Sequence, residues 1–158
     1  MTSHAVRRYP AAGDLPRWIG TGAIAGAVSV LAFHQGVLAL LYGLGLTTRA
    51  PYSIELTAPW GIPSLLSLAL WGAIWGAVLA ATLARLDGGR LVLGAVVFGA
   101  VLPTLVALIL VAPLKGQPTV TGVVPLAVLA AVLVNGAWGL GTGLGLAFFG
   151  RPRARSPR

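Results

Sequence analysis

The chain has 158 residues, of which 57% are hydrophobic and 9% are charged. Soluble globular domains have about a quarter of their residues charged, so this composition excludes an ordinary soluble domain. The absence of cysteine excludes disulfides, thiolate metal sites and cysteine nucleophiles. With three acidic residues and two histidines in the whole chain, carboxylate metal sites and acid–base pairs have few possible members.

Long apolar runs separate the charged residues. The uncharged runs are 18–48, 56–84, 91–114 and 116–150. A helix rises about 1.5 Å per residue, so roughly 20 apolar residues cross a hydrocarbon core of about 30 Å. Each run is therefore long enough for one crossing and too short for two, which predicts an all-α polytopic membrane protein. The expected transmembrane helices are 18–42, 61–84, 91–113 and 123–149.

Two other interpretations of the apolar runs fit less well. A membrane β-barrel has segments of about ten residues that alternate between polar and apolar, and these runs do not alternate. A cleavable signal peptide has an apolar region of about 7–15 residues, which is half the length of the first run here. We therefore expect a cytoplasmic tail at 1–17, a four-helix transmembrane domain at 18–150 and a basic cytoplasmic tail at 151–158.

The basic residues indicate the orientation. Arg49 and Lys115 fall on one side of the expected helices, and nine arginines fall on the other: Arg7, Arg8, Arg17, Arg85, Arg90, Arg151, Arg153, Arg155 and Arg158. Positive residues in short loops stay in the cytoplasm, so both termini are expected there. The same charges favour contact with anionic lipid headgroups over nucleic acid. The high ratio of arginine to lysine, with much Ala, Gly and Pro, indicates a bacterial inner membrane protein.

Aromatic residues mark the expected helix ends. Trp18 begins the first helix, and a tyrosine or tryptophan in that position usually lies at the lipid headgroups. The loop after the first helix, residues 43–60, contains Arg49, Glu55 and two prolines. It is the one loop with enough polar chemistry to recognise another molecule.

The two halves of the chain resemble each other weakly. Residues 26–41 align with 94–109 with six identities, which places Gly26 on Gly94. The second and fourth helices share a Gly-Ala-Trp-Gly-like patch. Coincidence in a narrow composition is the alternative. A real duplication would be a parallel repeat of two helices, with its axis along the membrane normal.

Glycine pairs spaced four residues apart occur within the expected helices. They include Gly22 and Gly26, Gly72 and Gly76, Gly139 and Gly143, and Gly141 and Gly145. Small residues let helices approach closely in lipid, so these pairs are expected to pack the four helices together. The alternative is that some face outward and dock a second copy or another membrane protein. The fourth helix, with two overlapping pairs, is the best candidate for such a contact.

Polar residues inside a membrane helix are costly and therefore informative. Counted along each helix, five of them reach a similar depth in the outer half of the membrane: His34, Gln35, Ser64, Ser67 and Thr104. We expect a small polar pocket there, with His34 as its titratable member. The alternative is that His34 is neutral and only fixes the packing of its helix.

A second polar contact is expected deeper in the membrane. Pro103 has no N–H, so the carbonyl of Gly99 loses its helical partner and the third helix should kink. Asn135 on the fourth helix lies at a similar height, and its amide is expected to donate to that carbonyl. This predicts a contact between the third and fourth helices.

The sequence contains no nucleotide-binding loop, dinucleotide fingerprint or zinc motif, and we expect no enzyme activity, cofactor or bound metal. Two classes of function remain. The first is a non-catalytic accessory or structural subunit that packs against a larger membrane complex, or against itself, through its glycine-rich faces. The second is a small oligomeric transporter or channel with its site around His34.

Overall fold

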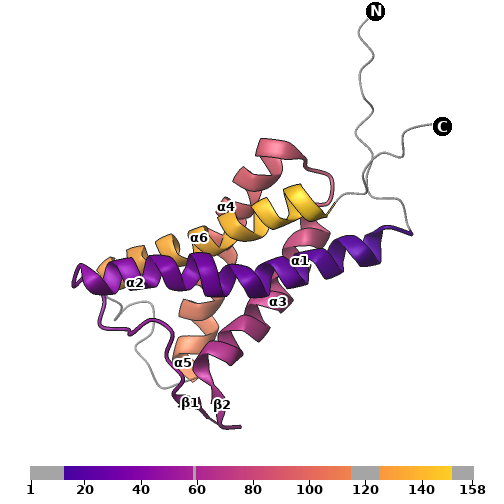
Figure 1. Ribbon diagram of the computed structural model, residues 1–158. Coiled ribbons are helices and arrows are strands. Elements are labelled where there is room, and N and C mark those ends of the chain that lie inside the picture. Colours follow the sequence, from indigo (N-terminus) through magenta and orange to yellow (C-terminus); the bar gives the residue numbers. More distant parts are fainter. Residues whose placement is uncertain (1–12, 59, 115–124, 151–158) are drawn as a thin grey trace, which may run out of the picture.

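The computed structural model describes residues 13–58, 60–114 and 125–150. The expected start of the fourth helix at 123, and most of both tails, lie outside these residues. Within them the chain is mostly helical and contains four helices long and apolar enough to cross a membrane (Figure 1). They cover Leu15–Gly43, Ser64–Thr82, Gly88–Leu114 and Pro125–Phe149.

The first helix is continuous but changes its winding near the middle. It consists of α1 (Leu15–Ser29), a π-helical segment η1 (Val30–His34) and α2 (Gln35–Gly43). A π turn inserts one extra residue, which rotates the residues beyond it around the helix axis and changes the carbonyl pairing. The sequence pattern gave no sign of this segment. His34 is its last residue, and it separates the buried glycines of α1 from Gln35.

The second helix follows a short hairpin. Strands β1 (Leu56–Thr57) and β2 (Ile62–Pro63) pair antiparallel, and α3 (Ser64–Thr82) begins directly after them. The third helix consists of α4 (Gly88–Val106), a second π-helical segment η2 (Ala107–Val111) and the short α5 (Ala112–Leu114). The fourth is α6 (Pro125–Phe149). Pro103 lies inside α4, one turn before η2.

The helices pack in the spatial order α3, α1, α6, α4, so two antiparallel pairs lie side by side (Figure 1). In the first pair, a Cβ added to Gly26 would lie 2.9 Å from the Cα of Gly76 and against the Gly72 carbonyl. Gly22 and Gly76 meet in the same way. Because glycine has no side chain, the backbones of α1 and α3 come into direct contact here.

The fourth helix uses its two glycine pairs on two different neighbours. Gly139 and Gly143 lie against the backbone and side chain of Ala95 on α4. Gly141 lies against Phe33 and Ser29 of the first helix, and Gly145 lies against Ala25. The overlapping spacing therefore serves two internal interfaces. These glycines have no room for a helix from another chain.

The two helix pairs share a contact pattern. Gly26 in the first pair and Gly99 in the second each lie against the backbone of the partner helix. By these contacts Gly76 has the same position in the first pair as Gly139 has in the second. Gly26 corresponds to Gly99 rather than to Gly94. A duplication of the two halves stays a prediction.

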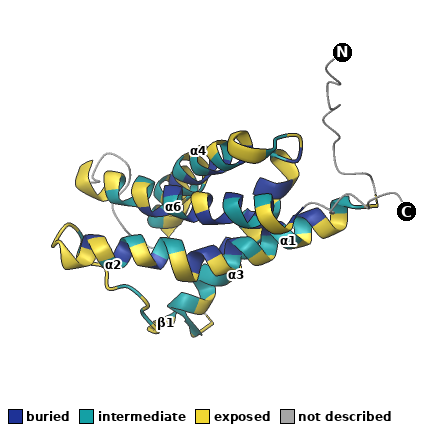
Figure 2. Cartoon of the chain, turned by 45° about the horizontal axis from the view of Figure 1, so that its top comes forward, coloured by how far each residue is buried: buried dark blue, intermediate teal, exposed yellow. Residues whose placement is uncertain are grey.

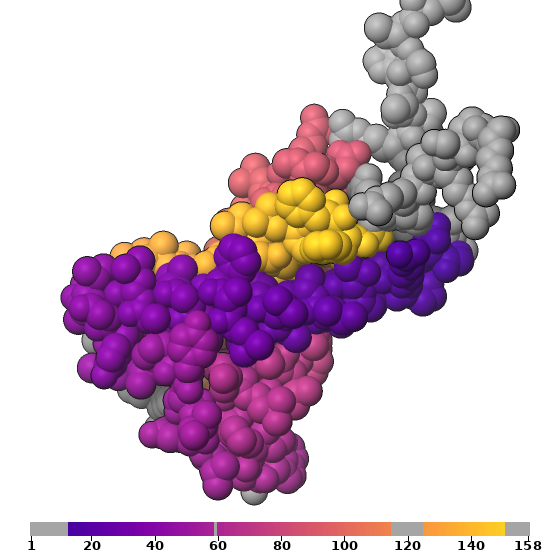
Figure 3. Space-filling model, in the orientation of Figure 1, coloured from indigo at the N-terminus to yellow at the C-terminus, as the bar shows by residue number. Residues whose placement is uncertain are grey.

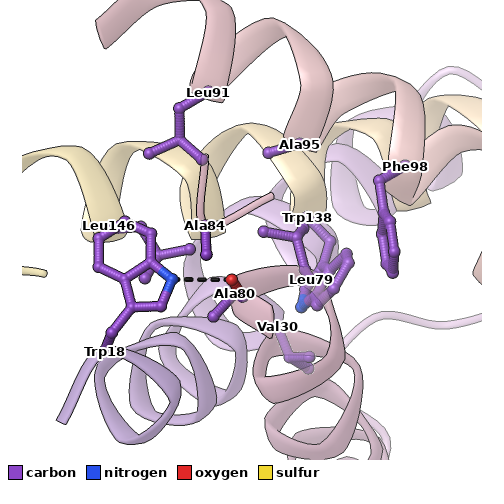
Figure 4. Close-up of a cluster of buried hydrophobic side chains, with 10 residues drawn as sticks. All are labelled: Trp18, Val30, Leu79, Ala80, Ala84, Leu91, Ala95, Phe98, Trp138 and Leu146. Atoms are coloured by element: carbon purple, nitrogen blue, oxygen red, sulfur yellow. Dashed lines mark hydrogen bonds between the residues drawn. The ribbon is translucent and has the colours of Figure 1, made fainter. Parts of the chain in front are cut away.

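The main core cluster lies where all four helices meet, and Figure 4 shows its side chains pointing toward one another. Trp18 belongs to this cluster, with 1% of its surface exposed, and its indole Nε1 donates to the Ala80 carbonyl at 2.7 Å. Trp18 therefore packs inside the bundle, and its level relative to the lipid headgroups stays a prediction. A tryptophan at the end of a helix can satisfy its N–H on a neighbouring backbone as well as at the membrane surface.

The arginines of the described chain fall mainly at one end of the bundle. Arg17 precedes Trp18, and Arg90 precedes Leu91 in the same core cluster. Arg85 lies in the connection between α3 and α4. Arg49 lies in the loop after α2, which is at the opposite end of the first helix.

Large apolar side chains are exposed along all four long helices. Figure 2 shows that exposed positions recur along the outer faces of the helices, and Figure 3 shows α1 and α6 side by side on one face of the molecule. Ile24 on α1, Leu93 on α4 and Phe148 on α6 are each more than 60% exposed. Apolar groups on the outside of a helix bundle are stable in lipid and unfavourable in water. The four apolar helices thus indicate a protein that spans a membrane.

Candidate functional site

Two side-chain hydrogen bonds join the first loop to the first helix. Gln35 is 2% exposed, and its Oε1 accepts a hydrogen bond of 2.7 Å from the backbone N–H of Tyr52. Tyr52 has a φ of 53°, in the left-handed region that non-glycine residues seldom adopt. Its hydroxyl donates to the Leu31 carbonyl, inside the π segment, at 3.0 Å. The loop is therefore bonded to the first helix at Leu31 and at Gln35, which lie before and after His34 in the sequence.

The same loop accepts hydrogen bonds from the first backbone N–H groups of α3. The backbone N–H of Ser64 donates to the Glu55 carbonyl at 2.8 Å, and that of Leu65 donates to the Ser53 carbonyl at 3.1 Å. The Ser64 hydroxyl also donates to the Ser53 carbonyl, at 2.6 Å. The first N–H groups of a helix have no partner within it, so the loop supplies the acceptors that a capping side chain would provide.

His34 and Ser67 are both half-buried. His34 closes the π segment, and its Nδ1 is buried without a hydrogen-bond partner. An imidazole nitrogen that stays unpaired in a buried place loses the free energy of a hydrogen bond. Ser67 lies one turn beyond Ser64 on α3.

Thr104 takes part in a different contact. It is 3% exposed on α4, and its Oγ1 accepts a hydrogen bond of 2.9 Å from the Asn135 amide on α6. The Thr104 hydroxyl itself lies 3.5 Å from the Ala131 carbonyl, to which it donates. Thr104 thus belongs to the interface between the third and fourth helices.

The expected inner contact is present with a different acceptor. Asn135 meets α4 near Gly99, whose added Cβ would touch the Asn135 backbone carbonyl. The hydrogen bond that the structure gives the Asn135 amide goes to Thr104, not to the Gly99 carbonyl that Pro103 leaves unpaired. Thr104 is five residues beyond Gly99 on α4. The side chain of Asn135 tilts toward the N-terminus of α6 and therefore reaches Thr104.

Of the five residues expected in one pocket, the structure links two. Gln35 and Ser64 bind the consecutive loop residues Tyr52 and Ser53, whereas Thr104 is engaged by α6. Depth along a helix can be estimated by counting residues, but the direction in which a side chain points depends on packing.

Several polar contacts were not expected. Ser29 is buried on α1, and its hydroxyl donates to the Trp138 carbonyl at 2.7 Å. The Trp138 indole donates to the Gly26 carbonyl at 2.9 Å, and the Thr142 hydroxyl donates to the Trp138 carbonyl at 2.9 Å. The bond of Ser29 could have been predicted from the sequence, because a hydroxyl inside an uncharged run needs a hydrogen-bond partner. The loop acceptors at Ser53 and Glu55 are backbone groups, for which a sequence offers no signal.

Within the described ranges, no group of three His, Asp or Glu side chains is placed to hold a metal ion. Comparisons with protein-family models, with curated proteins and with solved structures found no match.

Proposed function

We propose that this chain is a small non-catalytic membrane protein that acts as an accessory or structural subunit, and that it docks on a larger membrane complex through its first loop. The proposal differs in one respect from the expectation of docking through glycine faces. Gly26, Gly76 and Gly139 are occupied by contacts inside the chain, so the partner must bind other residues.

Docking through the first loop is supported by the apolar side chains that its hairpin exposes. Ile54, Leu56 and Trp60 are 75%, 72% and 82% exposed. The hairpin is also ordered by its own hydrogen bonds: the Gly61 N–H donates to the Thr57 carbonyl, and the Thr57 hydroxyl donates to the Ile62 carbonyl, each at 2.8 Å. Exposed aromatic and aliphatic side chains on a fixed backbone lose little conformational entropy on binding and are typical anchors of protein interfaces.

We further propose that both termini lie in the cytoplasm and that the membrane is a bacterial inner membrane. The support is the distribution of arginine: Arg17, Arg85 and Arg90 share one end of the bundle, and positive residues in short loops are retained on the cytoplasmic side. The hairpin then faces the other side of the membrane.

Site-specific photocrosslinking in native membranes tests the docking role. A photoreactive phenylalanine analogue in place of Trp60 is expected to give a discrete crosslinked protein species. The same analogue in place of Ile74, which is 53% exposed on α3, is expected to react with lipid only. Lipid adducts alone from both positions, together with a purified chain that stays monomeric and co-isolates with nothing, would contradict the accessory role.

One observation favours a second candidate, a small oligomeric transporter or channel. The buried Nδ1 of His34 has no partner, and a functional group awaiting a ligand is one cause of such an arrangement. Proton and potassium fluxes into liposomes containing the full chain test this candidate. Flux that His34→Ala abolishes and Thr82→Val, at an exposed position at the other end of α3, preserves would support transport. The absence of flux from the unmodified chain would count against it.

A further inference from the structure

An apolar groove lies along one face of α4, next to the end of α3. Its volume is about 590 Å³. The residues that line it are Leu83, Arg90, Leu93, Gly94, Val97, Phe98, Val101 and Leu102. Although α3 and α4 are consecutive in the chain, α3 packs mainly on α1 and α4 mainly on α6. The two helices meet where the rings of Trp75 and Phe98 pack edge to face, with centroids 6.0 Å apart, and make few other contacts. One face of α4 beside the end of α3 is therefore left uncovered.

The groove follows the long axis of the helix. Its α4 residues recur at intervals of three and four, so they form a single stripe on one helix face. From Arg90 to Leu102 the helix rises about 18 Å. That length is slightly more than half of a hydrocarbon core of about 30 Å. The groove thus runs from the membrane surface through about one leaflet.

Gly94 lets two leucine side chains pack closely against α4 near the charged end of the groove. A Cβ added to Gly94 would lie 3.0 Å from Leu86 Cδ1 and 3.4 Å from Leu83 Cδ1. Because Gly94 has no side chain, Leu83 and Leu86 lie directly on the helix surface next to the groove. Arg90 itself is exposed, at the end of the bundle that it shares with Arg17 and Arg85.

A second groove on the protein surface has no charged residue in its lining and serves as a comparison. It has a volume of about 310 Å³ and lies between α4 and α6. Its lining is entirely uncharged: Val96, Ala100, Val132, Leu133, Gly136, Ala137 and Leu140. Acyl chains can cover either groove. Of the two, the α3–α4 groove is the one that has an arginine, Arg90, at one end of its apolar lining. Guanidinium binds phosphate through paired hydrogen bonds in addition to its charge.

We propose that the α3–α4 groove binds an anionic phospholipid of the leaflet that meets the arginine-bearing end. The phosphate binds Arg90, and one acyl chain lies along the exposed side chains of Leu93, Val97 and Val101. This site is separate from the docking role proposed for the loop, because the hairpin lies at the opposite end of α3. Either proposal can fail without the other.

Native mass spectrometry of the full chain, purified in detergent, tests the site. The probes are phosphatidylglycerol and phosphatidylcholine with identical acyl chains, supplied in equal amounts. The unmodified chain is expected to retain phosphatidylglycerol preferentially. Arg90→Gln is expected to lower the retained phosphatidylglycerol about fivefold and to leave phosphatidylcholine unchanged, because one interfacial arginine contributes that much to anionic lipid binding.

Three further variants make the result specific. Arg17→Gln removes an exposed charge at the same end but outside the groove, and is expected to have a much smaller effect. Arg90→Lys keeps the charge and should retain most of the preference. Val97→Trp fills the groove and should lower the retention of both lipids. Equal retention of the two lipids by the unmodified chain, or equal losses in Arg17→Gln and Arg90→Gln, would overturn the proposal.

Discussion

The indole nitrogen of Trp138 donates a hydrogen bond of 2.9 Å to the carbonyl oxygen of Gly26. In the opposite direction, the hydroxyl of Ser29 donates to the Trp138 carbonyl at 2.7 Å. Both bonds are buried, and they join α1 to α6 where the two helix pairs of the bundle meet. Because lipid offers no hydrophobic drive between helices, polar bonds and close packing must hold the pairs together.

Replacing Trp138 with phenylalanine should lower the free energy of unfolding by about 1 kcal/mol, the scale of interhelical hydrogen bonds in membranes. The loss is limited because the Gly26 carbonyl keeps the N–H of Val30 as a partner within its own helix. Unfolding of the full chain in mixed micelles measures the change. Trp71→Phe is the control, since Trp71 is 57% exposed on the outer face of α3. Equal effects of the two substitutions would show that the Trp138 bond adds nothing to stability.

Gly26→Ala should separate α1 from α3. The new methyl group would meet the Gly72 carbonyl and lie 2.9 Å from the Gly76 Cα, and neither backbone can move aside without shifting a helix. Overpacking of this kind costs about 1–3 kcal/mol of unfolding free energy. Gly36→Ala in the same transmembrane helix meets no atom within 4 Å and should cause little or no loss. A stability of Gly26→Ala equal to that of Gly36→Ala would contradict the packing described here.

The number of helices was predictable because an uncharged apolar run of about 20 residues or more is stable as a helix that crosses the membrane. The few charged residues divide the chain into four such runs. The glycine spacing also indicated close packing. It did not indicate which neighbour each pair contacts. Gly139 and Gly141 are two residues apart yet face different helices, and that distinction depends on the arrangement of the whole bundle. The π segments at Val30–His34 and Ala107–Val111 depend on packing in the same way.

The contact between Asn135 and Thr104 should appear as a coupling energy. Asn135→Ala and Thr104→Val each remove one partner of the 2.9 Å bond, and the double variant removes both. A double-mutant cycle on unfolding free energies is expected to give a coupling of about 0.6 kcal/mol, and no more than about 1.7 kcal/mol. Strict additivity would mean that the two side chains do not stabilise each other.

Gln35→Ala should loosen the first loop. The Tyr52 N–H would lose its acceptor, and the left-handed backbone at Tyr52 would lose the bond that opposes its strain. Hydrogen exchange of peptides covering residues 44–56 is expected to become about tenfold faster, as the loss of one such hydrogen bond implies. Thr48→Ala, at an exposed position in the same loop, should leave the exchange unchanged. Unchanged exchange in Gln35→Ala would show that the loop is held by other contacts.

The polar site was less predictable than the helices. Depth along each helix placed Gln35, Ser64 and Thr104 at one level, but their partners come from the loop backbone and from α6. Backbone acceptors such as the Ser53 carbonyl have no sequence signature, because every residue has one. The role of Asn135 was closer to the expectation, since an amide inside a membrane must find a partner on a neighbouring helix.

The central claim is that the four helices cross the membrane and that the arginine-bearing ends share one side, in the cytoplasm. The chain has no cysteine, so single cysteines can be placed at exposed positions without a background signal. With a membrane-impermeant maleimide on intact cells, Ala50→Cys in the first loop is expected to react at once. Gly13→Cys and Gly89→Cys are expected to react only after the membrane is permeabilised. Reaction of Gly89→Cys and Ala50→Cys from the same side would contradict the account.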